Sequence, residues 1–101
     1  MRVIVMFDLP TETANDRRNY TKFRRYLIKS GFLMLQESVY VKLALNQNNA
    51  AYISDGVKKN KPPNGLVQIL SITEKQFSRM EIVTGTFATD VLDTDERLVI
   101  I

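Results

Sequence analysis

The sequence predicts an α+β domain, and three of its features point to this fold class. The N-terminal run, residues 2–7, is rich in Val and Ile, as is typical of a strand buried on both faces of a sheet that helices cover. Two later stretches carry apolar residues at helical spacing, and β-branched and aromatic residues dominate the segments between and after them. With 101 residues, we expect one compact domain built around one core.

The first expected strand, Arg2–Phe7, stops at a charged residue. Asp8 follows it directly and precedes the turn-forming pair Leu9-Pro10, so this carboxylate lies at the carboxyl edge of the strand. Ligands and metals of open α/β sheets gather at such edges, and a carboxylate there is a candidate ligand for a hard cation. The alternative is that Asp8 accepts N–H bonds from the backbone of the turn.

A helix is expected from Ala14 to Ser30. Thr13 is a suitable N-cap, and Asp16, three residues later, completes an imperfect capping box. Gly31 follows the helix at the position where a glycine commonly ends one. Capping would account for Asp16 without any catalytic role.

The two sides of this helix differ in character. On a helical wheel, Tyr20, Phe23 and Leu27 fall on the side expected to pack against the sheet. Cations occupy the opposite side with no acidic residue four positions away, an arrangement that gains nothing from local pairing. We therefore expect this side to bind a polyanion, although a merely solvated surface would have the same composition. The residues assigned to nucleic-acid binding are Arg17, Arg18, Lys22, Arg25 and Lys29.

The middle of the chain predicts further strands and a second helix. Residues 32–43 are expected to form two short strands joined by a tight bend, or one kinked strand. Asn46 then caps a helix whose apolar face includes Ala50 and Val57. This helix ends in the loop 58–65, which contains two prolines and a glycine.

The remaining residues are expected to add strands. Leu66–Ile72 is a strong strand candidate and Gln76–Val83 a weaker one. After an acidic stretch, the apolar segment Arg97–Ile101 is expected to complete a sheet edge, by first choice in a second copy of the chain, otherwise in its own protomer or in another protein. The order β-α-β-β-α-β with added C-terminal strands is that of the ferredoxin-like fold. Residues 1–85 would form its body, and residues 86–101 the acidic loop and edge strand of the same domain.

Composition excludes several classes of site. The chain has no cysteine, which excludes disulfides and thiolate metal sites. It has no histidine either, which excludes an imidazole base, Ser-His-Asp or Cys-His catalysis and the usual zinc ligands. Any hydrolysis must therefore use carboxylates with an oxygen-preferring cation such as Mg²⁺ or Mn²⁺. No apolar run approaches the roughly 20 residues of a membrane span, and we expect a cytoplasmic location without membrane contact.

The net charge of +3 conceals an asymmetry along the chain. Residues 1–63 carry eleven Lys or Arg against five Asp or Glu, whereas residues 64–101 carry three against six. A basic body with an acidic tail suggests a polyanionic partner for the first part. Three lysines of one loop either extend the basic surface or only keep the loop soluble: Lys58, Lys59 and Lys61.

Four segments together resemble a known family. They are the apolar strand that ends in Asp8-Leu9-Pro10, the Arg-rich first helix, the pattern Gln36-x-Ser38-Val39-Tyr40, and the strand that runs into Ile72-Thr73-Glu74-Lys75-Gln76-Phe77. In length and element order, nearly the whole chain is similar to the small CRISPR-associated endonuclease that accompanies the spacer-acquisition integrase. The chain departs from the pattern of this family at Met34 and Glu37, where basic residues are common, and at Phe7, where tyrosine is common.

The resemblance implies a ferredoxin-like homodimer with Asp8 as the metal-binding and catalytic residue and Mg²⁺ or Mn²⁺ as the cofactor. It further implies a CRISPR adaptation protein that binds duplex DNA as a scaffold for the integrase subunit, with metal-dependent endonuclease activity on double-stranded DNA or RNA. Two Asp8 side chains brought together across a two-fold axis would supply two carboxylates to one ion.

Two other functions fit the same fold. One is a toxin-like, metal-dependent endoribonuclease that is not tied to integration, because the same carboxylate would serve it. The other is a ferredoxin-like RNA-binding module without catalysis, although residues 39–43 lack the glycine and aromatic signature of such modules.

Overall fold

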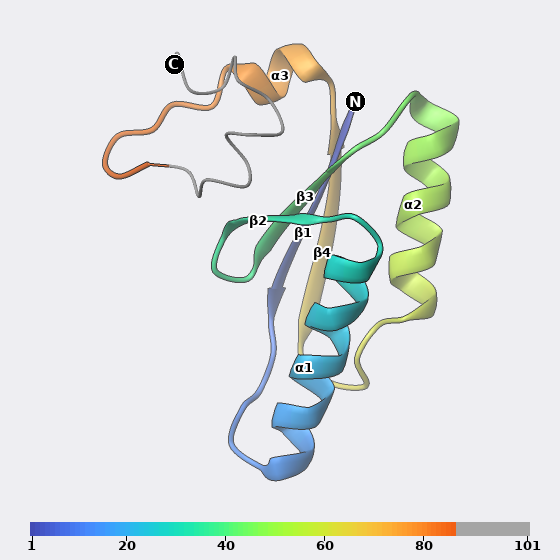
Figure 1. Cartoon of the computed structure of the whole chain (residues 1–101), viewed down its shortest axis with the longest axis vertical. Helices are drawn as coiled ribbons and strands as arrows, with labels where there is room; N and C mark the ends of the chain where they lie inside the picture. The colour runs from blue at the N-terminus through green and yellow to red at the C-terminus, as the bar shows by residue number, and fades with distance from the viewer. Residues whose placement is uncertain (87–101) are drawn as a thin grey trace.

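A computed structural model describes residues 1–86, whose course is shown in Figure 1. The elements are β1 (Arg2–Asp8), α1 (Ala14–Lys29), β2 (Leu33–Gln36), β3 (Val39–Leu43), α2 (Gln47–Lys59), β4 (Leu66–Ile72) and α3 (Glu74–Ser78). The first six follow the predicted order β-α-β-β-α-β, and residues 32–43 form two strands rather than one kinked strand.

The strands form one antiparallel sheet in the order β2-β3-β1-β4. β1 lies in the middle, where Ile4 is paired with Val41 of β3 on one side and with Leu70 of β4 on the other. β3 therefore separates β1 from β2, its neighbour in the sequence. This arrangement confirms the predicted ferredoxin-like fold.

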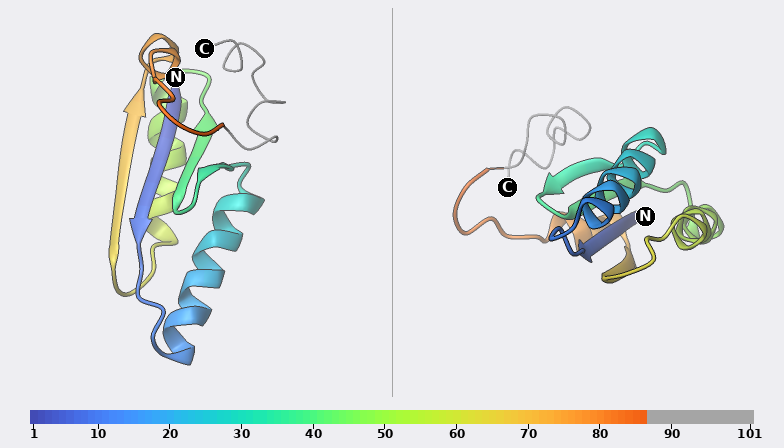
Figure 2. Two further views of the ribbon diagram at one scale, coloured as in Figure 1. Left: turned by 90° about the vertical axis from the view of Figure 1, so that its left-hand side faces the viewer. Right: turned by 90° about the horizontal axis from the view of Figure 1, so that it is seen from below.

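One face of the sheet packs against α1 and α2, as Figures 1 and 2 show. Because side chains alternate along a strand, Val3, Val5 and Phe7 of β1 all point to this face, where they are buried. The predicted apolar sides of both helices are confirmed, since the side chains that meet these three residues in the core are Phe23 and Leu27 of α1 and Ala50, Ile53 and Val57 of α2.

Local side-chain signals determine where the two long helices begin and end. Thr13 Oγ1 accepts a hydrogen bond from the N–H of Asp16 at 3.0 Å, and Asp16 Oδ2 accepts one from the N–H of Thr13 at 3.1 Å. This pair is a complete capping box. Gly31 lies just beyond the C-terminal end of α1 with a φ of 94°. Asn46 caps α2 by accepting from the N–H of Asn49 at 2.8 Å, as predicted.

The predicted strand Gln76–Val83 is wrong, because Glu74–Ser78 form the short helix α3 and no strand follows it up to residue 86. Thr73 Oγ1 accepts from the N–H of Gln76 at 3.0 Å, and Gln76 Oε1 accepts from the N–H of Thr73 at 2.9 Å. This second capping box begins a helix in a segment whose later β-branched residues had suggested a strand.

Within residues 1–86, the second face of the sheet is covered by a helix at one end only. α3 lies there, with Phe77 packed against Ile4 and Val41. We call the rest of this surface the open face; it is marked by three leucines that are about half exposed, Leu43, Leu66 and Leu70. The expectation that β1 is buried on both faces holds from Arg2 to Val5, because Arg2 and Ile4 on this second face are also buried. It is wrong at the end of the strand, where Met6 is half-buried and Asp8 is exposed. The predicted edge strand Arg97–Ile101 lies outside the described residues.

Candidate functional site

Asp8 is the last residue of β1, and its side chain is exposed. By strand alternation it belongs to the same side as Ile4 and Met6, so it stands at the rim of the open face. Its register partner on β4 is Leu66. Because β1 is antiparallel to both of its neighbours, β3 and β4 begin at the edge where β1 ends. The sequence had predicted the carboxyl edge of a parallel sheet, where neighbouring strands end together, and the structure differs in this respect.

Two turns hold the backbone around Asp8. Ser38, in the turn between β2 and β3, accepts a hydrogen bond from the N–H of Phe7 at 3.0 Å. Gly65, in the turn before β4, lies so close that a Cβ on it would come within 2.8 Å of the Asp8 carbonyl oxygen and 2.7 Å of Leu9 Cδ2. Within residues 1–86 the Asp8 carboxylate itself makes no hydrogen bond or ion pair, so the alternative role in the turn finds no support there.

One copy of the chain offers few ligands to a metal ion. Among residues 1–86, no three Asp or Glu side chains come together in a group that could hold a cation. Mg²⁺ is commonly bound by one or two carboxylates together with waters and substrate phosphates. Asp8 fits this donor set as one carboxylate.

The cations of α1 surround a shallow depression on the outer side of the helix. Its volume is about 630 Å³, and Ala14 and Thr21 are among the residues that line it. The structure thereby brings together four of the five predicted nucleic-acid-binding residues, namely Arg17, Arg18, Lys22 and Arg25. The fifth, Lys29, is exposed near the C-terminal end of the same helix and does not line the depression.

These cations differ in the hydrogen bonds that they make within the protein. Arg17 donates to the backbone carbonyls of Thr11 at 3.2 Å and Glu12 at 3.1 Å, so it also supports the loop between β1 and α1. Arg18 makes one long contact with the Asn15 side chain, 3.4 Å. No carboxylate of the described residues forms an ion pair with any of the five cations. Their charge is therefore available to a ligand.

The predicted loop lysines are placed differently. Lys58 and Lys59 belong to the last turn of α2, where cations interact favourably with the helix dipole. Lys58 Nζ lies 3.9 Å from Asp55 Oδ1. These two lysines thus have local roles in the helix, and Lys61 is exposed in the loop that follows.

One buried cation was missed by sequence reasoning. Arg2 is 3% exposed, its Nε donates to Glu74 Oε2 at 2.8 Å, and its guanidinium lies 4.7 Å from the centre of the Phe77 ring. The contact joins the start of β1 to α3. A Thr73-x-x-Gln76 capping signal in the sequence could have revealed the helix, but nothing local could have paired residues 72 positions apart.

Comparison with known proteins decides the family. A family model described as CRISPR associated protein Cas2 matches residues 1–80. The chain belongs to the Cas2 family. This confirms the resemblance found in the four sequence segments.

Curated relatives in the Cas2 family resemble this chain along its whole length. A protein of Treponema denticola is 57% identical over 101 residues, which is 100% of both chains. One of Lacticaseibacillus rhamnosus is 46% identical over 101 residues, again 100% of both. One of Streptococcus mutans strain UA159 is 46% identical over 99 residues, 98% of this chain and 91% of the relative. All three are named CRISPR-associated endoribonuclease Cas2, and these names support nuclease activity.

Within residues 1–86, no helix is both long and apolar enough to span a bilayer.

Proposed function

We propose that two copies of this chain form a homodimer that holds a nucleic-acid backbone on the outer side of α1 and cleaves phosphodiester bonds at Asp8. The observation that carries this proposal is the depression lined by Arg17, Arg18, Lys22 and Arg25. Four cations around one concave surface repel one another, and that cost is offset when phosphates bind between them. Contacts of this kind recognise the shape and charge of a backbone rather than its sequence.

The open face supports the proposed homodimer. Leu43, Leu66 and Leu70 leave apolar surface in water there, and a second copy would cover it through the same residues on both sides of a two-fold axis. Asp8 stands at the rim of this face, so a two-fold axis that passes near this rim would bring the two Asp8 side chains toward the same region. A pair of carboxylates then serves a cation that a single copy holds poorly.

The cofactor of this centre is Mg²⁺ or Mn²⁺, held by the Asp8 carboxylates. When bound, the cation polarises a phosphate and lowers the pKa of a bound water. The chain itself positions the carboxylate and the substrate. Gly65 and Ser38 hold the backbone on either side of Asp8, and the α1 cations fix the phosphates of the substrate.

Two substrates are supported by different observations. The names of the relatives favour RNA as the strand that is cleaved. The broad cationic side of α1, doubled in a homodimer, favours duplex DNA as a ligand that is bound without cleavage, in a scaffold for the integrase subunit during CRISPR adaptation. Both activities would take place in the cytoplasm.

The proposed role of α1 can be tested by measuring duplex binding after the charges on its outer side are reversed. Combining Arg18→Glu, Lys22→Glu and Arg25→Glu should weaken binding to unrelated duplexes about equally. It should also flatten the salt dependence, because each lost phosphate contact removes about 0.9 from the slope of log affinity against log salt. Affinity would be measured by fluorescence anisotropy over a series of salt concentrations.

A matched control carries the same change in net charge elsewhere. Lys61, Lys75 and Arg79 are exposed and lie outside α1, so replacing all three with Glu should preserve most of the affinity. Equal losses in the two triple variants would show that only net charge matters, and the α1 depression would then not be the binding site.

A further inference from the structure

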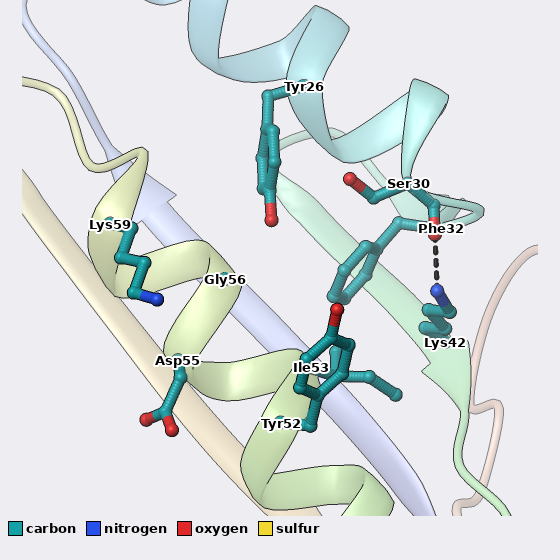
Figure 3. Close-up of a pocket in the computed structure, with 9 residues that line it drawn as sticks. All are labelled: Tyr26, Ser30, Phe32, Lys42, Tyr52, Ile53, Asp55, Gly56 and Lys59. Carbon is teal, nitrogen blue, oxygen red and sulfur yellow. Dashed lines mark hydrogen bonds between the residues drawn. The ribbon is translucent and has the colours of Figure 1, made fainter.

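A second cavity lies between the C-terminal half of α1 and α2, and the proposed function does not use it. Its volume is about 420 Å³, within the range of about 300–1,000 Å³ that is typical of small-molecule sites. Figure 3 shows side chains from both helices and from β3 around it. Sequence reasoning did not find this cavity, because its walls come from three separate segments.

Aromatic side chains form much of its wall. Tyr26 extends from α1 toward α2, and Tyr52 extends from α2 with its hydroxyl directed toward Phe32 (Figure 3). The Tyr26 hydroxyl lies against Gly56, where a Cβ would come within 2.6 Å of it. Phe32 is buried, whereas Tyr52 is 77% exposed and so is accessible to a ligand. Flat aromatic surfaces with polar tips suit a nucleobase.

A lysine stands on each side of these rings. Lys42 of β3 is half-buried, and its ammonium donates to the Ser30 carbonyl, which holds it in place with two protons left to share. Lys59 reaches from the last turn of α2, and its ammonium turns toward the space between the helices (Figure 3). The carboxylate of Asp55 is turned away from the Tyr26 ring and lies near Lys58.

We propose that this cavity binds one unpaired nucleotide, with its base against Tyr26 and Tyr52 and its flanking phosphates at Lys42 and Lys59. A phosphate alone would not use the aromatic wall, and a purely apolar ligand would not use the two lysines. A nucleotide within a strand has a phosphate on each side of its base and matches both features.

The cationic side of α1 borders this cavity. Lys22 and Lys29 lie four residues before and three residues after Tyr26, so all three are neighbours on the helix surface. A strand held on α1 can therefore place one nucleotide in the cavity. This inference rests on the proposed function only for the source of the nucleotide, because a free nucleotide offers the same chemistry.

The probe for the site is adenosine 3′,5′-bisphosphate, titrated into the full chain by calorimetry. Lys59→Ala and Tyr52→Ala change exposed side chains and should each weaken binding about tenfold, through loss of a charged contact and of stacking, respectively. Lys61→Ala removes an exposed lysine that does not line the cavity and should leave affinity unchanged. Unchanged binding in both cavity variants, or pyrophosphate binding as tightly as the probe, would overturn the proposal.

Oligonucleotides distinguish the two sources of ligand. If the cavity variants weaken binding of a single-stranded oligonucleotide but not of a blunt duplex, the ligand is an unpaired residue of a strand. If they weaken binding of the bisphosphate alone, the ligand is a free nucleotide, and the cavity is still its site. The Arg18, Lys22, Arg25 triple variant should retain bisphosphate binding. The bisphosphate therefore tests the cavity alone, and duplex binding by the triple variant tests the α1 surface alone.

Discussion

Asp8 is positioned by the backbones of its neighbours and not by bonds of its own side chain. Ser38, which accepts from the N–H of Phe7, has a φ of 63°, a conformation that costs a non-glycine residue about 1–2 kcal/mol. Gly65 has a φ of 96° and no room for a Cβ. Two turns in unusual conformations therefore flank Asp8, and conformational cost of this kind is often found at functional sites.

Gly65→Ala should disturb Asp8 without altering its chemistry. The added methyl group would press on the Asp8 carbonyl and on Leu9, and the positive φ adds about 1–2 kcal/mol of strain. We expect a lower free energy of unfolding in urea. We also expect slower cleavage than in the wild type under conditions where the variant is still fully folded, since that loss cannot come from unfolding.

Gly85→Ala is the matched control, because Gly85 also has a φ of 96° but nothing within 4 Å of an added Cβ. It carries the same backbone strain without the contact. If the two variants cleave equally well, the close approach of Gly65 does not position Asp8.

Asp8→Asn should abolish cleavage in the presence of Mg²⁺ or Mn²⁺ while leaving the fold intact. The side chain is exposed and has no bond to lose within residues 1–86, so the unfolding free energy should change by no more than about 0.5 kcal/mol. Nuclease assays on RNA and duplex DNA, with circular dichroism as the check on folding, measure both effects. Cleavage at the wild-type rate would remove Asp8 from the mechanism.

At the residue scale, the sequence revealed the residues whose signals are local. The caps Thr13 and Asn46 were identified because a cap and its partner are three residues apart. The contact between Arg2 and Glu74 was missed because it depends on a fold that brings distant segments together. The same reason hid the cavity between α1 and α2.

At the element scale, α1 and α3 show how long a helix must be for the periodicity of its sequence to predict it. α1 has 16 residues, so the periodicity of its sequence alone predicted its apolar and cationic sides. α3 has five residues, too few for any periodicity, and nearby β-branched residues such as Ile82 favoured the wrong element. Only its capping box distinguished it from a strand.

Phe77→Ala should show how much α3 contributes to the folded state. Phe77 is 1% exposed and packs on Ile4 and Val41, so its truncation should lower the unfolding free energy by about 3–5 kcal/mol. Val83→Ala, at a residue that is 93% exposed, should change it by no more than about 0.5 kcal/mol. Urea denaturation measures both. A loss below about 1 kcal/mol for Phe77→Ala would mean that α3 detaches at little cost.

At the scale of the whole molecule, the two proposed interfaces lie on opposite sides of the sheet. The helices α1 and α2 cover one face, and the cations of α1 point outward from that layer. The open face lies on the other side, with Asp8 at its rim. A second copy can therefore cover the open face while nucleic acid occupies α1, and dimerisation would present two cationic surfaces to one duplex.

Leu70→Lys tests whether a second copy covers the open face. Leu70 is 49% exposed and is paired with the central Ile4, so a lysine there should not disturb the core of its own protomer. Across a two-fold axis the substitution acts twice, and each buried leucine contributes about 1.5–3 kcal/mol. The dimer dissociation constant should rise at least about a hundredfold, as measured by sedimentation equilibrium.

Leu45→Lys provides the comparison for the dimer test, because Leu45 is 86% exposed and belongs to the loop between β3 and α2 rather than to a strand of the sheet. It introduces the same charge in place of the same side chain and should leave self-association unchanged. Cleavage should then fall in Leu70→Lys and not in Leu45→Lys, since a monomer offers only one Asp8 to the cation. If Leu70→Lys dimerises as tightly as the wild type, the open face is not the interface, and the pairing of two Asp8 carboxylates would have to be abandoned with it.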